Sequence, residues 1–301
     1  MGVLRLNIKK WIIATRPWAF PMTIITVSIG GVYALYENGA FNIVLYLLTI
    51  IGTILLHASV NVYNDYYDTL SGVDRRGAPT TKYRPHPIIE GLIPSNQLFL
   101  MATISMVIAL LIGLYLALVV GWLAIILGGL GGFLAFEYTG PPLYLKYRGL
   151  GELSVFLAWG PLMVLGSYYV ISGGLLSINP ILISIPTALL VVAVLMANNI
   201  RDIEYDESVN VRTLQVRIGR EKSIKLYIIT ILLAYITVII EILLRILPLL
   251  TLLVFITLPK ALKLIRLFRR EIPDAADPLT AQLLILFGIT YIISLLISII
   301  L

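Results

Sequence analysis

Cysteine is absent from the 301-residue chain, which excludes disulfide bonds, thiolate metal sites and a cysteine nucleophile. Only two histidines are present, His57 and His86, and these are too few for a histidine-rich zinc or haem centre. Charged residues make up 13% of the chain, whereas about a quarter is usual in a soluble globular domain. Since 59% of the residues are hydrophobic, the sequence predicts an integral membrane protein.

Nine apolar segments approach or exceed the length of about 20 residues that a helix needs to cross a bilayer. They cover approximately residues 18–36, 42–64, 97–118, 121–138, 152–172, 179–201, 223–244, 247–265 and 279–300. The second and sixth segments both end in an Asn–Asp motif followed by a basic loop. We therefore expect one all-α membrane domain over residues 1–301, built from two related halves of four helices and one extra helix.

The positive charges are distributed very unevenly among the loops. If the N-terminus lies inside the cell, 21 of the 22 Lys and Arg residues fall on the inner side, and Arg245 is the exception. This bias follows the positive-inside rule. The sequence therefore predicts a multi-pass protein of the cell membrane with a cytoplasmic N-terminus, cytoplasmic long loops and an external C-terminus. The net charge of +6 is explained by topology, so no nucleic-acid partner is expected.

The first polar motif, "NVYNDYYDTLSGVD" at residues 61–74, follows directly after an apolar run. Asn61, Asp65 and Asp68 are spaced i, i+4 and i+7, which places them on one face of a helix. Asn64 stands beside Asp65, and Asp74 follows in the loop. A helix that crosses a membrane would thus end in a cluster of carboxylates and amides.

The second polar motif, "NNIRDIEYD" at residues 198–206, repeats this arrangement at the end of the sixth apolar segment. Asn198, Asp202 and Asp206 share a face if the helix continues, and Arg201 lies among them. Oxygen ligands on two opposed elements suit Mg²⁺, which binds few carboxylates and completes its shell with water and substrate phosphates. The guanidinium fork of Arg201 matches phosphate oxygens and is a candidate contact for a diphosphate.

Two less specific interpretations of the motifs stay open. The acids could be solvated helix ends, although two matching clusters at matching positions argue against this. They could also mark the pathway of a cation-coupled transporter, which would place acids near helix centres and often break helices in both halves. His57 lies one turn deeper on the first acidic face, where a histidine more often packs in the core than binds a ligand.

Basic and aromatic residues accumulate near the same inner ends of the helices. Lys146 and Arg148 lie in "YTGPPLYLKYRGLGE" with Tyr138, Arg212 lies in "VRTLQVRIG", and Arg16 lies in "TRPW". Each cation either contacts an anionic substrate or contributes only to the positive-inside bias. Tyrosines near the motifs either anchor the interface or line a cavity, where ring faces stabilise a cation.

The paired motifs resemble the two Asp-rich motifs of the UbiA superfamily of intramembrane prenyltransferases, and the resemblance covers nearly the whole chain. The spacing from Asp65 to Asp74, together with "YRGLGE" and "NNIRD", is most similar to the branch that acts on 1,4-dihydroxy-2-naphthoate in menaquinone biosynthesis. The resemblance implies nine helices around a central cavity that opens laterally to lipid, a prenyl diphosphate donor and an aromatic acceptor. It also implies two Mg²⁺ ions between the motifs, bridged by the diphosphate.

On this resemblance, the residues that bind the metal are Asn61, Asp65, Asp68, Asn198, Asp202 and Asp206. The residues expected to bind substrate are Arg16, Asn64, Asp74, Tyr138, Lys146, Arg148, Arg201 and Arg212. Within the superfamily, the acceptor could instead be geranylgeranylglyceryl phosphate, 4-hydroxybenzoate, homogentisate or haem, since cavity shape sets this choice. A transporter is less compatible with the motifs because the acids lie at helix ends on one side.

Overall fold

The computed structural model describes residues 8–301, and over this range every regular element is a helix. The long elements are α2 (Phe20–Asn38), α3 (Ile43–Leu70), α5 (Ser95–Val120), α6 (Leu123–Glu137), α7 (Gly151–Leu157), α8 (Met163–Ile171), α10 (Ile185–Arg201), α13 (Arg220–Leu243), α14 (Leu258–Arg270) and α15 (Ala276–Ile300). The shorter ones are α1 (Ile8–Ala14), α4 (Thr80–Tyr83), α9 (Asn179–Ile183), α11 (Ile203–Ser208) and α12 (Leu214–Ile218). The predicted all-α fold class is confirmed.

The number of membrane-crossing helices differs from the nine that the sequence predicts. Among the described residues, seven helices are long and apolar enough to cross a bilayer. The apolar segment 121–138 yields only the 15-residue α6. The segment 247–265 is divided between a 3₁₀ stretch at Leu249–Thr257 and the amphipathic α14, so it is not one continuous α-helix. A count of nine is therefore not confirmed.

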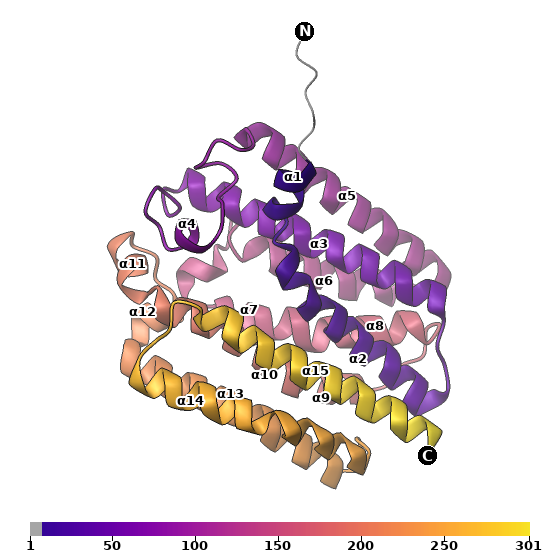
Figure 1. The fold of residues 1–301 in the computed structure, drawn as a ribbon. Coiled ribbons are helices and arrows are strands. Elements are labelled where there is room, and N and C mark those ends of the chain that lie inside the picture. Colours follow the sequence, from indigo (N-terminus) through magenta and orange to yellow (C-terminus); the bar gives the residue numbers. More distant parts are fainter. Residues whose placement is uncertain (1–7) are drawn as a thin grey trace.

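The helices pack side by side as a bundle (Figure 1). Helix α3 packs against α5, while α2 packs against α8 and α15, and α10 packs against α13 and α15. The elements α4, α11 and α12 lie at one end of the bundle, and the C-terminus lies at the other end (Figure 1). The connections that carry polar motifs therefore meet at a single end.

Helix α3 carries the first polar motif beyond the point where its apolar run ends. Its N-terminus is capped by Asn42, whose side chain accepts hydrogen bonds from the backbone N–H groups of Val44 and Leu45 at 3.0 and 3.1 Å. The helix continues to Leu70, six residues past the end of the apolar segment predicted at residue 64. Asp65 and Asp68 are thus on continuous helix, as their spacing required.

A π-helical stretch at Ala158–Leu162 interrupts the segment between α7 and α8. It contains Pro161, and a proline removes a backbone donor and bends a helix. Gly160 has non-helical angles there, and a Cβ atom at this position would lie 2.6 Å from the Cβ of Ala188 on α10. The glycine therefore allows α10 to approach closely, and the bend sets the position of Trp159.

Candidate active site

Asp65 is fully buried near the C-terminal end of α3 and is surrounded by cations. Arg84 donates two hydrogen bonds to it, at 2.9 Å to Oδ2 and 2.5 Å to Oδ1. Arg16 makes a second ion pair with the same carboxylate and donates to Asn64 Oδ1 at 2.9 Å. The sequence left open whether Arg16 only marks topology, and the structure brings it to the first motif. Arg84 was not predicted.

Asp68 lies one turn further along α3 and contacts the loop after α6. Lys146 Nζ donates to Asp68 Oδ2 at 2.7 Å, and the hydroxyl of Tyr147 donates to Oδ1. Asn64 Nδ2 donates to Oδ2 at 3.1 Å. Burial alone would lower the Lys146 pKa, but the charge of Asp68 holds that pKa well above its usual value. Lys146 is therefore a permanent cation beside the first motif.

Asp74 is held in the loop after α3 by Thr80 and His86. Thr80 Oγ1 donates to Oδ1 at 2.8 Å, and His86 Nε2 lies 3.1 Å from Oδ2. Since Nδ1 of His86 accepts the backbone N–H of Ile89 at 3.3 Å, the network assigns the imidazole proton to Nε2. Burial alone would raise the Asp74 pKa, but the hydrogen bond from His86 and the charge of Lys146 lower it to about 2.

Asp65, Asp74 and His86 offer ligand atoms within 4.8 Å of one another. In this arrangement, however, His86 presents a donor rather than a lone pair to the two carboxylates. The trio is therefore a hydrogen-bonded support for Asp74, and a metal would require its rearrangement. Neither His86 nor Tyr147 was among the predicted site residues.

The second motif lies at the junction of α10 and α11. Helix α10 ends at Arg201, yet the backbone bonds from Asp202 to Asn198 and from Asp206 to Asp202 keep the spacing of a helix. Arg201 donates to both oxygens of Asp202 at 2.8 and 2.9 Å and to Asn198 Oδ1 at 2.7 Å. It also pairs with Asp277 on α15, a partner that the sequence did not predict.

Asp206 connects the two motifs electrostatically. Burial raises its pKa to about 7; the charge of Lys146 opposes this, and Asp202, Asp68 and Asp74 reinforce it. These groups act on one another because the two motifs lie close together. Tyr205 adds a direct link, since its hydroxyl donates to the backbone carbonyl of Val73 at 2.5 Å.

Of the remaining predicted residues, Tyr138 lies beside this cluster, close enough to Lys146 and Asp68 for their charges to act on its hydroxyl, whereas the others make no hydrogen bond to its carboxylates within the described chain. Arg148 and Arg212 are exposed, and neither side chain contacts the buried acids within the described chain. Asn61 donates to the backbone carbonyl of Thr15 at 2.9 Å and so fixes the N-terminal segment. Tyr138 is half-buried at the end of α6, and its carbonyl accepts the backbone N–H of Lys146 at 2.9 Å. Their predicted contacts with metal or substrate stay predictions.

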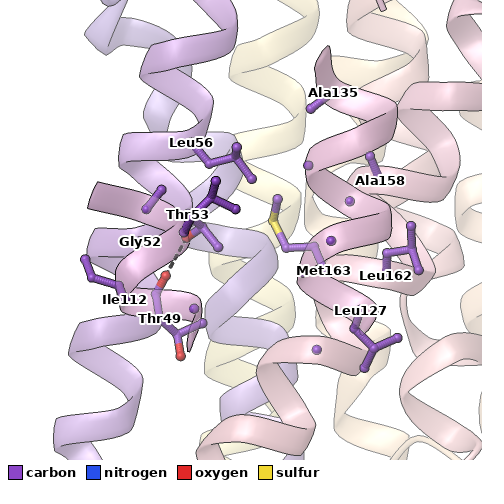
Figure 2. Close-up of a pocket in the computed structure, with 18 of the residues that line it drawn as sticks. Thr49, Gly52, Thr53, Leu56, Ile112, Leu127, Ala135, Ala158, Leu162 and Met163 are labelled. Carbon is purple, nitrogen blue, oxygen red and sulfur yellow. Dashed lines mark hydrogen bonds between the residues drawn. The ribbon is translucent and has the colours of Figure 1, made fainter. Parts of the chain in front are cut away.

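An apolar cavity of about 600 Å³ lies in the same bundle, within the range of about 300–1,000 Å³ that ligand pockets occupy, and its lining includes Tyr63, which directly precedes Asn64 and Asp65 on α3. Its walls come from α3, α5, α6 and the bent α7–α8 segment (Figure 2). Gly128, Gly129, Gly131 and Gly132 on α6 contribute wall without side chains. Cβ atoms at the first three of these would meet nothing within 4 Å, so the glycines keep the cavity open.

The polar cluster is chemically suited to a hard divalent cation. Asp65, Asp68, Asp202 and Asp206 are 0–8% exposed and offer carboxylate oxygens, the donors that Mg²⁺ prefers. In the structure three of these four carboxylates are paired with Arg or Lys. The same cations can pair instead with an anionic ligand that arrives with the metal.

Buried carboxylates and cations thus gather at one end of a bundle whose helices are long and apolar enough to cross a membrane, and an apolar cavity lies within the same bundle. The chain belongs to the UbiA prenyltransferase family, whose model matches residues 23–287. It is therefore a multi-pass membrane protein and a transferase of prenyl groups.

Relatives from several kingdoms are similar over nearly the whole chain. UbiA prenyltransferase domain-containing protein 1 of Xenopus tropicalis is 30% identical over 283 residues, covering 94% of this chain and 80% of the relative. The 1,4-dihydroxy-2-naphthoate octaprenyltransferase of Bacillus subtilis is 31% identical over 288 residues, covering 94% and 91%. The fold is shared with a UbiA homolog of Archaeoglobus fulgidus bound to DMAPP and Mg²⁺, with a TM-score of 0.73, 16% identity and coverage of 97% and 99%.

Proposed function

We propose that the chain transfers a polyprenyl group from a prenyl diphosphate to 1,4-dihydroxy-2-naphthoate, with two Mg²⁺ ions bridged by the diphosphate. The observation that carries the donor is the continuity of α3, which bears Asp65 and Asp68 at one end and lines the apolar cavity with its preceding turns. A charged head and an apolar tail would be bound along one helix. The similarity to the Bacillus subtilis enzyme supports the acceptor.

The four aspartates Asp65, Asp68, Asp202 and Asp206 would hold the metal. Bound Mg²⁺ supplies neutralisation of the diphosphate as it departs. The cations that now pair with the aspartates would turn to the diphosphate oxygens when the metal takes the carboxylates. Guanidinium groups bind two such oxygens at once, which suits Arg16, Arg84 and Arg201 to this role. Lys146 would act as a point charge.

The transfer itself needs little further from the chain. The bond between the allylic carbon and the diphosphate oxygen breaks, and the diphosphate keeps the electron pair. The ring carbon that bears the carboxylate forms the new carbon–carbon bond, and the carboxylate leaves as CO₂ while its bonding electrons restore the aromatic ring. Charges and atoms balance without removal of a proton. The apolar cavity excludes water, and Tyr63, Phe136 and Trp159 on its wall offer ring faces to the cation.

The test is an acceptor panel with the purified full chain, labelled geranylgeranyl diphosphate and Mg²⁺. We expect a prenylated naphthoquinol and one CO₂ per turnover from 1,4-dihydroxy-2-naphthoate, and no product when EDTA removes the metal. Transfer to geranylgeranylglyceryl phosphate or 4-hydroxybenzoate, with none to the naphthoate, would reject the acceptor. If the protein consumes no prenyl diphosphate with any of the acceptors, the proposed function as a whole is rejected.

A further inference from the structure

His57 lies on α3 two turns deeper than Asp65, at the spacing 57, 61 and 65 that places it on the face of the first motif. At 1.5 Å per residue, it lies about 12 Å further along the helix axis than Asp65. It is 6% exposed and belongs to the wall of the apolar cavity. A buried imidazole thus borders the space below the proposed diphosphate site.

A chain of hydrogen bonds joins this imidazole to Trp159 through Thr23. Trp159 Nε1, which can only donate, donates to Thr23 Oγ1 at 3.3 Å. The same Thr23 oxygen lies 2.8 Å from His57 Nδ1. The Thr23 hydroxyl can donate to Nδ1, and in that tautomer the ring proton lies on Nε2.

The ring is also held in orientation by its neighbours. Phe20 and Trp159 pack edge-on against it, with centroid distances of 5.6 and 5.1 Å. Within the described chain, Nε2 makes no hydrogen bond, and it is not among the fully enclosed polar atoms. His57 lines the cavity, and a donor at Nε2 would serve a ligand that enters it.

The other polar groups of the cavity wall are already occupied. Thr49, Thr53 and Ser167 donate to backbone carbonyls within their own helices at 2.7, 2.7 and 3.1 Å. The hydroxyl of Tyr63 pairs with Thr103 at 2.9 Å, and the indole N–H of Trp159 is bound to Thr23. Among the side-chain donors that line the cavity, His57 Nε2 is therefore the one that has no acceptor in the described chain.

We propose that His57 is an acceptor-binding residue, whose Nε2–H donates a hydrogen bond to an oxygen substituent of the aromatic acceptor. An isoprenoid tail has no oxygen to receive this bond, whereas a hydroxylated or carboxylated ring does. The bond holds the ring below the diphosphate, with its reactive carbon toward the allylic carbon. The proposal rests on the proposed function, because it assumes that an aromatic acceptor enters this cavity.

The experiment compares His57→Phe, which keeps a ring but removes the donor, with His57→Gln, which restores an N–H. We expect His57→Phe to raise the KM for 1,4-dihydroxy-2-naphthoate about tenfold, as loss of one hydrogen bond implies. The KM for geranylgeranyl diphosphate should stay within about twofold, and His57→Gln should recover part of the loss. Binding of the naphthoate without donor or metal, followed by tryptophan fluorescence, should weaken by the same factor in His57→Phe.

Two further variants keep the proposal open to refutation if His57→Phe folds poorly. Thr237→Val removes a hydroxyl that is bonded within its own helix, α13, which does not line the cavity, so the acceptor KM should not change. Thr23→Val removes the hydroxyl that contacts Nδ1 of His57 and should raise that KM by a smaller factor. Equal acceptor binding in wild type and both His57 variants, or an equal rise of both KM values, would overturn the role of His57. Absence of turnover in the wild type would instead count against the proposed function.

Discussion

Replacing Arg84 by Met should lower the stability of the metal-free protein against unfolding and raise its affinity for Mg²⁺. The Arg84 side chain is 4% exposed and holds both oxygens of a fully buried Asp65. Loss of one partner from a buried ion pair costs about 3–5 kcal/mol, and the remaining pair with Arg16 places this case at the lower end. A loss of about 3 kcal/mol corresponds to a fall of about 5 °C or more in the unfolding midpoint of a chain of this size.

The variant should nevertheless bind Mg²⁺ about tenfold more tightly, because the metal no longer displaces Arg84 from Asp65. The assay is thermal unfolding of the purified chain across a Mg²⁺ titration without substrate. Arg148→Met is the matched control, since Arg148 is exposed and should change stability by no more than about 0.5 kcal/mol. Equal midpoints for the two variants, or an Mg²⁺ affinity unchanged from the wild type in Arg84→Met, would refute the reasoning.

Four further predictions concern the metal site, the cavity and the topology. Asp202→Ala should abolish turnover while the protein remains folded, and near-normal activity would remove Asp202 from the site. The Asp206 carboxyl has a pKa of about 7 and must lose its proton to bind a cation. The affinity for Mg²⁺ should therefore rise from pH 6 to pH 8 and level off above pH 8. Asp206→Asn should flatten this rise when Mg²⁺ is titrated at each pH. Gly129→Leu fills part of the cavity and should shift the donor preference toward shorter prenyl chains by about tenfold, as measured by the length of the product. Leu130→Phe, on the exposed face of the same helix, should leave the donor preference unchanged. A membrane-impermeant maleimide should label Arg76→Cys only from the cytoplasmic side, and labelling from outside alone would reverse the predicted orientation.

Local patterns in the sequence predicted those features of the structure that depend on residues close together in the chain. The spacing of Asn61, Asp65 and Asp68 required a continuous helix, and α3 provides it to Leu70. Arg84 escaped prediction because it reaches Asp65 across 19 residues, through a loop with little regular structure. Only the folded chain shows which of many basic residues makes such a contact.

Hydropathy also failed to predict the form of one helical segment. Residues 247–265 are apolar enough for a span, but a sum of side-chain hydropathies does not distinguish a 3₁₀ turn from an α-helix. The chain after Pro248 winds as 3₁₀ through Leu249–Thr257 before α14 begins. Likewise, the contact between Arg201 and Asp277 joins residues 76 positions apart, and no periodicity in the sequence signals it.

The ion pairs that join the two polar motifs to their neighbouring cations have a consequence for biogenesis. Six carboxylates, Asp65, Asp68, Asp74, Asp202, Asp206 and Asp277, face four cationic side chains, Arg16, Arg84, Lys146 and Arg201, so most of the negative charge is compensated before any ligand arrives. Uncompensated charge in a low-dielectric interior is costly, and this cluster avoids most of that cost with its own residues. The newly made chain can therefore be inserted and folded without waiting for metal, unlike small zinc domains whose folding depends on the ion. Metal supply would then limit the turnover of the mature protein and leave its accumulation in the membrane unaffected.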